Sequence, residues 1–209
     1  MKAIYIAAAS IFAIAASPVF AGDLYVLGSV GRTSANLNQG AIDANLRSAG
    51  ATGVSSNVNE TDTGYKLQLG YQVNQNLAVE GGYVNLGKFT YSASFTGGSA
   101  NATVEADGFN IAALGIIPID ESFSLFGKLG AIRAKLEASV SASGPGGSAS
   151  GSASTSQWKG NYGVGAIYNF NKNASARLEF EQFHQLGDNN TTGGTSNVNM
   201  WSLGFAYKF

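Results

Sequence analysis

Few side chains in this 209-residue sequence could do acid–base or electrostatic chemistry. Five charged residues alternate with apolar or small neighbours along extended segments: Lys66, Glu80, Lys128, Arg177 and Glu179. Such alternation places charges on the face opposite the apolar one. If that face lines a narrow interior, each charge must be paired, because an unpaired buried charge is strongly destabilising. The set could form a satisfied polar core, or exchange partners and open a small ion path.

The single histidine, His184, is the natural candidate for a catalytic base. It lies in the segment QFHQLGDNN, near the expected outer end of a strand and close to Asp188. Serine and threonine are so abundant nearby that their proximity carries little information. There is no cysteine, no phosphate loop, no EF-hand and no histidine cluster. We therefore expect no catalytic residues, no metal site and no cofactor, and interpret His184 as an interfacial side chain.

Composition narrows the classes of protein further. Charged residues make up 12% of the chain, the net charge is -1, and 28 residues are glycine. Because there is no basic excess to neutralise phosphates, a nucleic-acid partner is not expected. Disorder is excluded by a hydrophobic content of 44%. The sequence therefore indicates either an unusual soluble β protein or a protein partly surrounded by lipid.

The first 21 residues are typical of a cleaved signal peptide. Lys2 precedes an uncharged apolar stretch, which Ser17-Pro18 ends, and cleavage is expected between Ala21 and Gly22. The apolar core is short for a helix that spans a membrane. We expect a single domain over residues 22–209, with segment 1–21 removed on export.

The remaining chain alternates with a period of two, which predicts strands. The clearest segment is 63–73, where Tyr and Leu face one side and Lys, Gln and Gly the other. Eight strands are expected near residues 23–32, 60–73, 77–93, 104–117, 123–139, 157–170, 174–186 and 197–209. The pattern leaves open which way the first and fourth of them face.

The expected connections alternate in length. Short turns fall at Asn74–Asn76, Pro118–Ser122 and Asn171–Asn173. The other connections are longer and polar, including Thr33–Asn59 and a Ser/Gly/Ala tract at Ser141–Ser156, which we expect to be mobile. Short turns at one end and long loops at the other are typical of an outer-membrane barrel.

The polar face distinguishes a membrane barrel from a soluble sandwich. A soluble sheet would carry many charges on the face that meets water, whereas here that face is mostly small and polar. Small side chains allow eight strands to close, and closure removes the sheet edges that hydrocarbon does not tolerate. We therefore predict an all-β, eight-stranded antiparallel up-and-down transmembrane β-barrel, with a secreted β-sandwich as the alternative.

Four segments of the chain resemble the transmembrane domain of the outer-membrane protein A family and, more distantly, the small outer-membrane protein X and Ail-type barrels. They are YVLGSVG at 25–31, LQLGYQVNQNLAVEGGYVNLGK at 67–88, SARLEFE at 175–181 and WSLGFAYKF at 201–209. The resemblance implies a bacterial outer-membrane location, contact with lipid and lipopolysaccharide, and a monomer. It aligns Glu80 and Arg177 with a pair that crosses the family's lumen. It also implies that Leu203, Phe205, Tyr207 and Phe209 form the sequence that the barrel-assembly machinery reads.

The family resemblance favours a structural, non-enzymatic barrel whose external loops contact a host or surface ligand. The chain ends at Phe209, so the peptidoglycan-binding domain of the longer family members is not expected. A narrow gated porin-like channel is the alternative. A lipid-modifying enzyme based on His184 is a second alternative, although the sequence lacks the His-x-Ser arrangement of the lipid A deacylase family.

Overall fold

The computed structural model describes residues 22–187 and 194–209. The expected signal peptide, Ala21 at its cleavage site, and Asp188 lie outside these residues. Nine strands and one helix occur along the described chain: β1 (Asp23–Ala35), α1 (Gln39–Ser48), β2 (Ser55–Asn59), β3 (Thr61–Asn74), β4 (Leu77–Phe95), β5 (Gly98–Pro118), β6 (Phe123–Gly144), β7 (Gly147–Asn169), β8 (Ala174–Leu186) and β9 (Ser196–Lys208). Every strand pairing is antiparallel.

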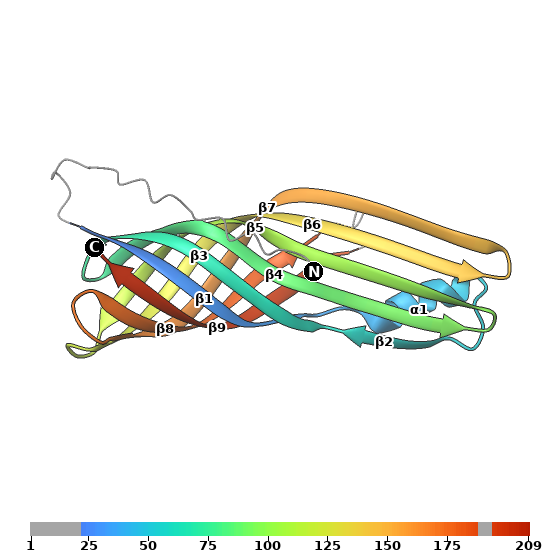
Figure 1. Ribbon diagram of the computed structural model, residues 1–209, viewed down its shortest axis with the longest axis horizontal. Coiled ribbons are helices and arrows are strands. Elements are labelled where there is room, and N and C mark those ends of the chain that lie inside the picture. The colour runs from blue at the N-terminus through green and yellow to red at the C-terminus, as the bar shows by residue number, and fades with distance from the viewer. Residues whose placement is uncertain (1–21, 188–193) are drawn as a thin grey trace, which may run out of the picture.

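The strands close into a ring. Each strand from β3 to β9 pairs with the next, and β1 joins the two ends by pairing with both β3 and β9. The short strand β2 precedes β3 and pairs with the outer part of β4, so it adds no member to the ring. The expected eight-stranded antiparallel barrel is confirmed, and Figure 1 shows its tilted strands at one end of an elongated molecule.

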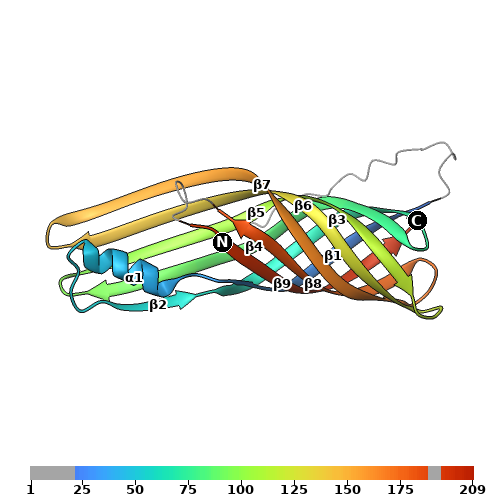
Figure 2. The same cartoon turned by 180° about the vertical axis from the view of Figure 1, so that it is seen from behind.

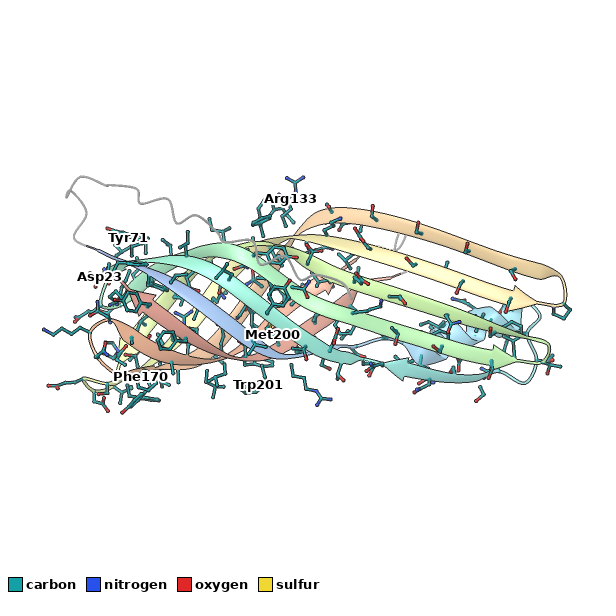
Figure 3. All side chains as sticks on the ribbon, in the orientation of Figure 1. Asp23, Tyr71, Arg133, Phe170, Met200 and Trp201 are labelled. Carbon is teal, nitrogen blue, oxygen red and sulfur yellow. The ribbon has the colours of Figure 1, made fainter. Side chains whose placement is uncertain are left out.

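An apolar band covers the outside of the barrel. It includes Leu67, Leu129, Val164 and Leu203, each at least 59% exposed to the surroundings. On all eight strands, the next outward position beyond this band is polar: Arg32, Thr63, Asn85, Asp107, Arg133, Ser156, Gln182 and Asn199. We call these eight residues the outer polar ring. Figure 3 shows Arg133 and Trp201 pointing away from the barrel near this boundary.

The structure also gives the direction in which the first and fourth strands of the barrel face. On β1, Tyr25 and Leu27 point inward and Leu24 and Val30 outward. On β5, the side chains of Ala112, Leu114 and Ile116 are buried, whereas those of Phe109 and Ile111 are exposed. Both strands are apolar on both faces because their inner residues pack inside the barrel, which explains why their sequence pattern was ambiguous.

Four strands continue well beyond the barrel. β4 to β7 extend past the outer polar ring, while β1, β3, β8 and β9 end near it (Figures 1 and 2). Residues 141–144 and 147–156 belong to paired strands joined by a two-residue turn, so the expectation of a long mobile connection at Ser141–Ser156 was wrong. Together with β2, these outer parts of β4 to β7 form what we call the extracellular sheet, because the longer connections of outer-membrane barrels lie outside the cell.

The two faces of the extracellular sheet differ in chemistry. A row of alanines crosses four strands through the register pairs Ala93–Ala100, Ala100–Ala142 and Ala142–Ala149. The adjacent row is entirely serine: Ser94, Ser99, Ser143 and Ser148. Alternation of Ala with Ser therefore gives one methyl-lined face, continuous with the barrel interior, and one hydroxyl-lined face.

The connection between β1 and β2 contains the helix α1, which the sequence pattern did not predict. Asn38 caps it by accepting a hydrogen bond from the Ala41 backbone N–H at 3.0 Å. Asp43 then anchors it to the extracellular sheet by accepting hydrogen bonds from Tyr91 at 2.6 Å and Ser56 at 2.9 Å. No helix in the described ranges is long and apolar enough to cross a membrane.

Candidate functional site: a charged layer inside the barrel

Three cations and three anions form one buried layer across the lumen, which we call the charged layer: Lys66, Lys128, Arg177, Glu80, Glu179 and Glu181. Each of these side chains is at most 4% exposed. The cations come from β3, β6 and β8, and the anions from β4 and β8. The formal charges cancel, as a buried set requires.

The two lysines share the carboxylates of β8. Lys66 Nζ lies 2.8 Å from Glu181 Oε2 and 3.0 Å from Glu179 Oε2. Lys128 Nζ lies 2.9 Å from Glu179 Oε1, 3.1 Å from Glu181 Oε1 and 3.9 Å from a Glu80 oxygen. Because both lysines approach both β8 carboxylates, the four charges form a closed set that ties β3 and β6 to β8.

Glu80 and Arg177 form the part of the layer nearest the short turns. Arg177 Nη1 donates to Glu80 Oε1 at 2.6 Å, and the Tyr25 hydroxyl donates to the same oxygen at 2.6 Å. The guanidinium also lies 4.9 Å from the ring centroid of Phe126, close enough for a cation–π contact. The Tyr25 ring lies on it as well, 6.0 Å from the guanidinium, so Arg177 is held by one carboxylate and two aromatic rings.

Glycines in the barrel wall make room for the rings around Arg177. A Cβ on Gly70 would lie 2.1 Å from the Tyr25 ring, and a Cβ on Gly165 would lie 2.6 Å from the Phe126 ring. Both contacts are closer than real atoms approach, so neither ring could keep its place beside a larger residue. These two glycines are therefore required for the position of Arg177.

Apolar side chains pack against the charged layer on both sides, and on the side of the short turns Arg177 also lines a cavity. Toward the outside, one cluster includes Leu86, Ile132, Phe183 and Met200, all fully buried. Toward the short turns, a second cluster contains Leu27, Ala78, Leu114 and Phe126, among others. The interior is therefore filled with side chains, as expected for a barrel of eight strands.

Some buried polar atoms in the lumen have no protein partner. Both polar atoms of the Gln68 amide and the Ser202 hydroxyl are buried without one. Nearby, Asn110 donates to Asn161, which in turn donates to Glu181 at 2.6 Å. Buried polar groups are normally satisfied by protein or by ordered water, so Gln68 and Ser202 mark positions that suit internal water.

The structure brings all five charges singled out in the sequence into this one layer. It adds Glu181, which shares the inward face of β8 with Arg177 and Glu179. Glu181 could have been found from the sequence, because residues two apart on a strand point the same way and Glu181 follows Glu179 by two residues. Tyr25 and Asn161 had no such signal, since nothing in the sequence shows which charge they contact.

His184 lies outside the charged layer. Its side chain is exposed on β8, and it has no hydrogen bond or ion pair with any other residue that the structure describes. Asp188, its suggested neighbour, is not among those residues. No group of three or more metal-binding side chains occurs among them either. The described part of the chain therefore contains no arrangement resembling a catalytic triad or metal centre.

A closed barrel with an apolar outer band, a polar boundary and a charged but filled interior defines a small integral membrane β-barrel. The chain belongs to the OmpA-like transmembrane domain family, whose sequence model matches residues 21–209. It is 32% identical to outer membrane protein A of Serratia marcescens over 143 residues. That alignment covers 68% of this chain and 38% of the relative's length.

Solved structures show the same fold. Neisserial surface protein A superposes with a TM-score of 0.56 at 13% identity, covering 89% of this chain and 97% of that one. AlkL superposes with a TM-score of 0.52 at 16% identity, covering 100% and 97%. Because the family is that of the outer-membrane barrels, this protein is a bacterial outer-membrane β-barrel.

Proposed function

We propose that this protein is a non-enzymatic barrel that presents the extracellular sheet to a ligand outside the cell. The observation that carries the proposal is the extension of β4 to β7 beyond the outer polar ring. Inside the hydrocarbon the backbone must be paired in strands, but beyond it the chain is not under this constraint. Long strands held by a rigid barrel are a suitable support for binding, because little flexibility is lost on contact.

The helix α1 is a second part of this surface. Hydrogen bonds from Tyr91 and Ser56 hold the pKa of the Asp43 carboxyl below its usual range, while burial and the bond to Asp43 raise the pKa of the Tyr91 hydroxyl. Both groups are thus in their bonding forms at neutral pH. The helix is fixed against β2 and β4, so the binding surface includes its exposed face.

Shortening the extracellular sheet tests this proposal. Deleting residues 139–142 and 149–152 removes four residues from each of β6 and β7. The register between these two strands is kept, because the pair Ser143–Ser148 then takes the place of the pair Ser139–Ser152. Bacteria displaying the shortened protein should lose adherence to cultured cells and immobilised lipopolysaccharide. The barrel should still fold, which heat-modifiable gel migration checks. Equal adherence by both forms, or none by the full chain, would contradict the proposal.

The filled lumen favours a closed barrel over a channel. The fully buried apolar cluster on the outer side of the charged layer closes the lumen, and ions pass hydrophobic constrictions poorly. In planar bilayers the purified protein should show no conductance above background. Steady openings would instead support a gate in which Glu80 exchanges Arg177 for Lys128, whose Nζ is already 3.9 Å from Glu80.

The enzymatic alternative has its own test. A lipid-modifying activity based on His184 requires a partner that orients the imidazole, and none occurs among the described residues. Lipid A from cells that carry His184→Ala should have the same composition as that from cells with the unaltered protein. If the substitution changes lipid A in the same way as removal of the gene, the protein is an enzyme.

A further inference from the structure

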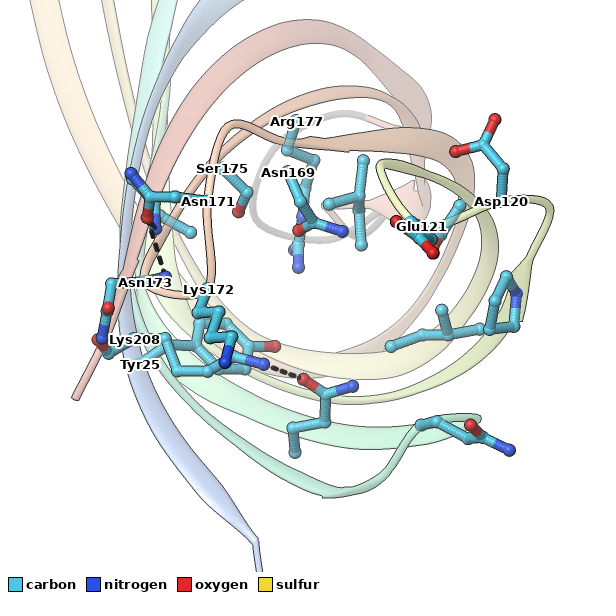
Figure 4. Close-up of a pocket in the computed structure, with 18 residues that line it drawn as sticks. Tyr25, Asp120, Glu121, Asn169, Asn171, Lys172, Asn173, Ser175, Arg177 and Lys208 are labelled. Carbon is cyan, nitrogen blue, oxygen red and sulfur yellow. Dashed lines mark hydrogen bonds between the residues drawn. The ribbon is translucent and has the colours of Figure 1, made fainter.

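The end of the barrel opposite the extracellular sheet contains a cavity of about 290 Å³. Figure 4 shows the residues that line it among the short turns, with Arg177 among them. Short turns lie on the periplasmic side in outer-membrane barrels, so this cavity opens to the periplasm. Its size is near the lower limit for small-molecule sites, which suits a ligand of one or two amino acids.

Charges of opposite sign lie on opposite sides of the mouth. Asp120 and Glu121 belong to the turn between β5 and β6, while Lys172 belongs to the turn between β7 and β8 and Lys208 to the end of β9 (Figure 4). They form no ion pairs with one another across the cavity. The mouth is thus electrically polarised, and charge complementarity favours a ligand with a positive and a negative end.

Two of these four charged groups are available for binding. Glu121 and Lys172 have no hydrogen bond or ion pair with any residue in the described ranges. Lys208, in contrast, is already 3.2 Å from Asp23 and donates to Gln72. Asp120 uses one oxygen to accept the backbone N–H groups of its own turn. Glu121 and Lys172 are therefore the pair that a ligand can satisfy.

Arg177 provides an independent reason to expect a ligand carboxylate. It is buried among the residues that line the cavity, and its Nη1 donates to Glu80 at 2.6 Å. A guanidinium carries five N–H groups, so donors remain for a second acceptor. A ligand carboxylate in the cavity would supply that acceptor, and Lys172 lines the same cavity.

We propose that this periplasmic cavity binds a zwitterionic amino acid or short peptide. The ligand carboxylate lies toward Arg177 and Lys172, and its ammonium group lies toward Glu121. A simple anion would be repelled by Asp120 and Glu121, and a simple cation by the lysines and Arg177. The side-chain amides of Asn169 and Gln75 also line the cavity and suit the peptide group of a dipeptide. This site lies at the end of the molecule opposite the extracellular sheet, so it is separate from the binding surface proposed above.

Titration of the purified full-length protein with L-alanyl-L-alanine, followed by NMR, tests the proposal. Saturable shifts are expected at the amides of residues 119–123 and 170–174, with a Kd of about 1 mM. N-acetyl-L-alanine, which lacks the ammonium group, and L-alanine amide, which lacks the carboxylate, should each bind about tenfold more weakly. Equal binding of the zwitterion and either derivative would overturn the proposal, as would the absence of saturable shifts.

Rim variants make the test specific. Glu121→Gln and Lys172→Gln should each weaken dialanine binding about two- to fivefold, as expected for an exposed charge. Both residues are exposed on turns, so the barrel should fold normally. Lys88→Gln, which breaks an exposed ion pair on the extracellular sheet, is the matched control and should leave the Kd unchanged. Unchanged binding in both rim variants would show that the mouth charges do not recognise the ligand.

Discussion

Replacing Glu80 with alanine should strongly destabilise the barrel. The Glu80 carboxylate is fully buried and accepts hydrogen bonds from Arg177 and Tyr25, each at 2.6 Å. Its removal leaves the guanidinium of Arg177, itself 4% exposed, without a carboxylate. Breaking a buried pair in this way costs about 3–5 kcal/mol. Glu179, two residues further along β8 than Arg177, is already bound by both lysines, so rescue should be small.

Urea unfolding in lipid vesicles, followed by tryptophan fluorescence and heat-modifiable migration, measures this effect. With a urea dependence of about 1–3 kcal/mol per molar, a loss of about 3–5 kcal/mol should lower the unfolding midpoint by about 1–5 M. Glu105→Ala is the control, because it removes a half-exposed partner of Lys88 and should cost about 1 kcal/mol or less. Replacing Glu80 and Arg177 together with methionine should recover much of the loss, since no charge remains unpaired. A Glu80→Ala midpoint equal to that of the control would refute this account of the interior.

Three other predictions concern the packing around Tyr25, the anchor of the helix α1 and the C-terminal strand β9. Gly70→Ala should destabilise the barrel by about 1–3 kcal/mol because its Cβ would clash with the Tyr25 ring; Gly28→Ala, which meets nothing within 4 Å, should be close to neutral in the same urea assay. The pKa of Asp43 is lower in the folded state than in the unfolded state. The Asp43 carboxylate therefore stabilises the fold above its unfolded pKa, and this stabilisation is lost as the pH falls through its folded pKa. Amide exchange at residues 39–48 should therefore rise in acid before exchange in the barrel does. The substitution Tyr91→Phe should raise the same exchange at neutral pH. Equal exchange in the variant and the parent would contradict the anchor. Leu203, Phe205, Tyr207 and Phe209 point outward, where the barrel-assembly machinery could read them. If it does, truncation of Phe209 should reduce the amount of assembled barrel in cells, which pulse-labelling of membranes measures.

The membrane-spanning strands could be predicted from sequence because their two faces differ sharply. Leu67 and Leu69 alternate with Lys66 and Gln68, a contrast that only one register satisfies. The charged layer followed from the same contrast, since a charge between apolar neighbours on such a strand must point inward. The partners within the layer could not be predicted, because they depend on which strands the closed ring places opposite each other.

The extracellular sheet could not be recognised in the same way. Ala142 and Ser143 alternate as strictly as Leu67 and Gln68, yet alanine and serine differ little in polarity and are both common in loops. A weak contrast in polarity therefore concealed a regular period of two. The helix α1 was missed for a related reason: only Ile42 and Leu46 among its larger apolar residues are four apart, and its anchor is a polar contact.

The arrangement of the interior accounts for where function can reside. Three positive and three negative charges balance in one layer, and the apolar cluster on its outer side excludes an open path. Such a layer is costly to desolvate and adds little net stability by itself, but it strongly disfavours any register that leaves one charge unpaired. The charged layer thus specifies how β3, β4, β6 and β8 close around the lumen. Because the layer holds the barrel in register, ligands are left with the two ends of the molecule: the extracellular sheet, and the periplasmic cavity, which reaches the charged layer at Arg177.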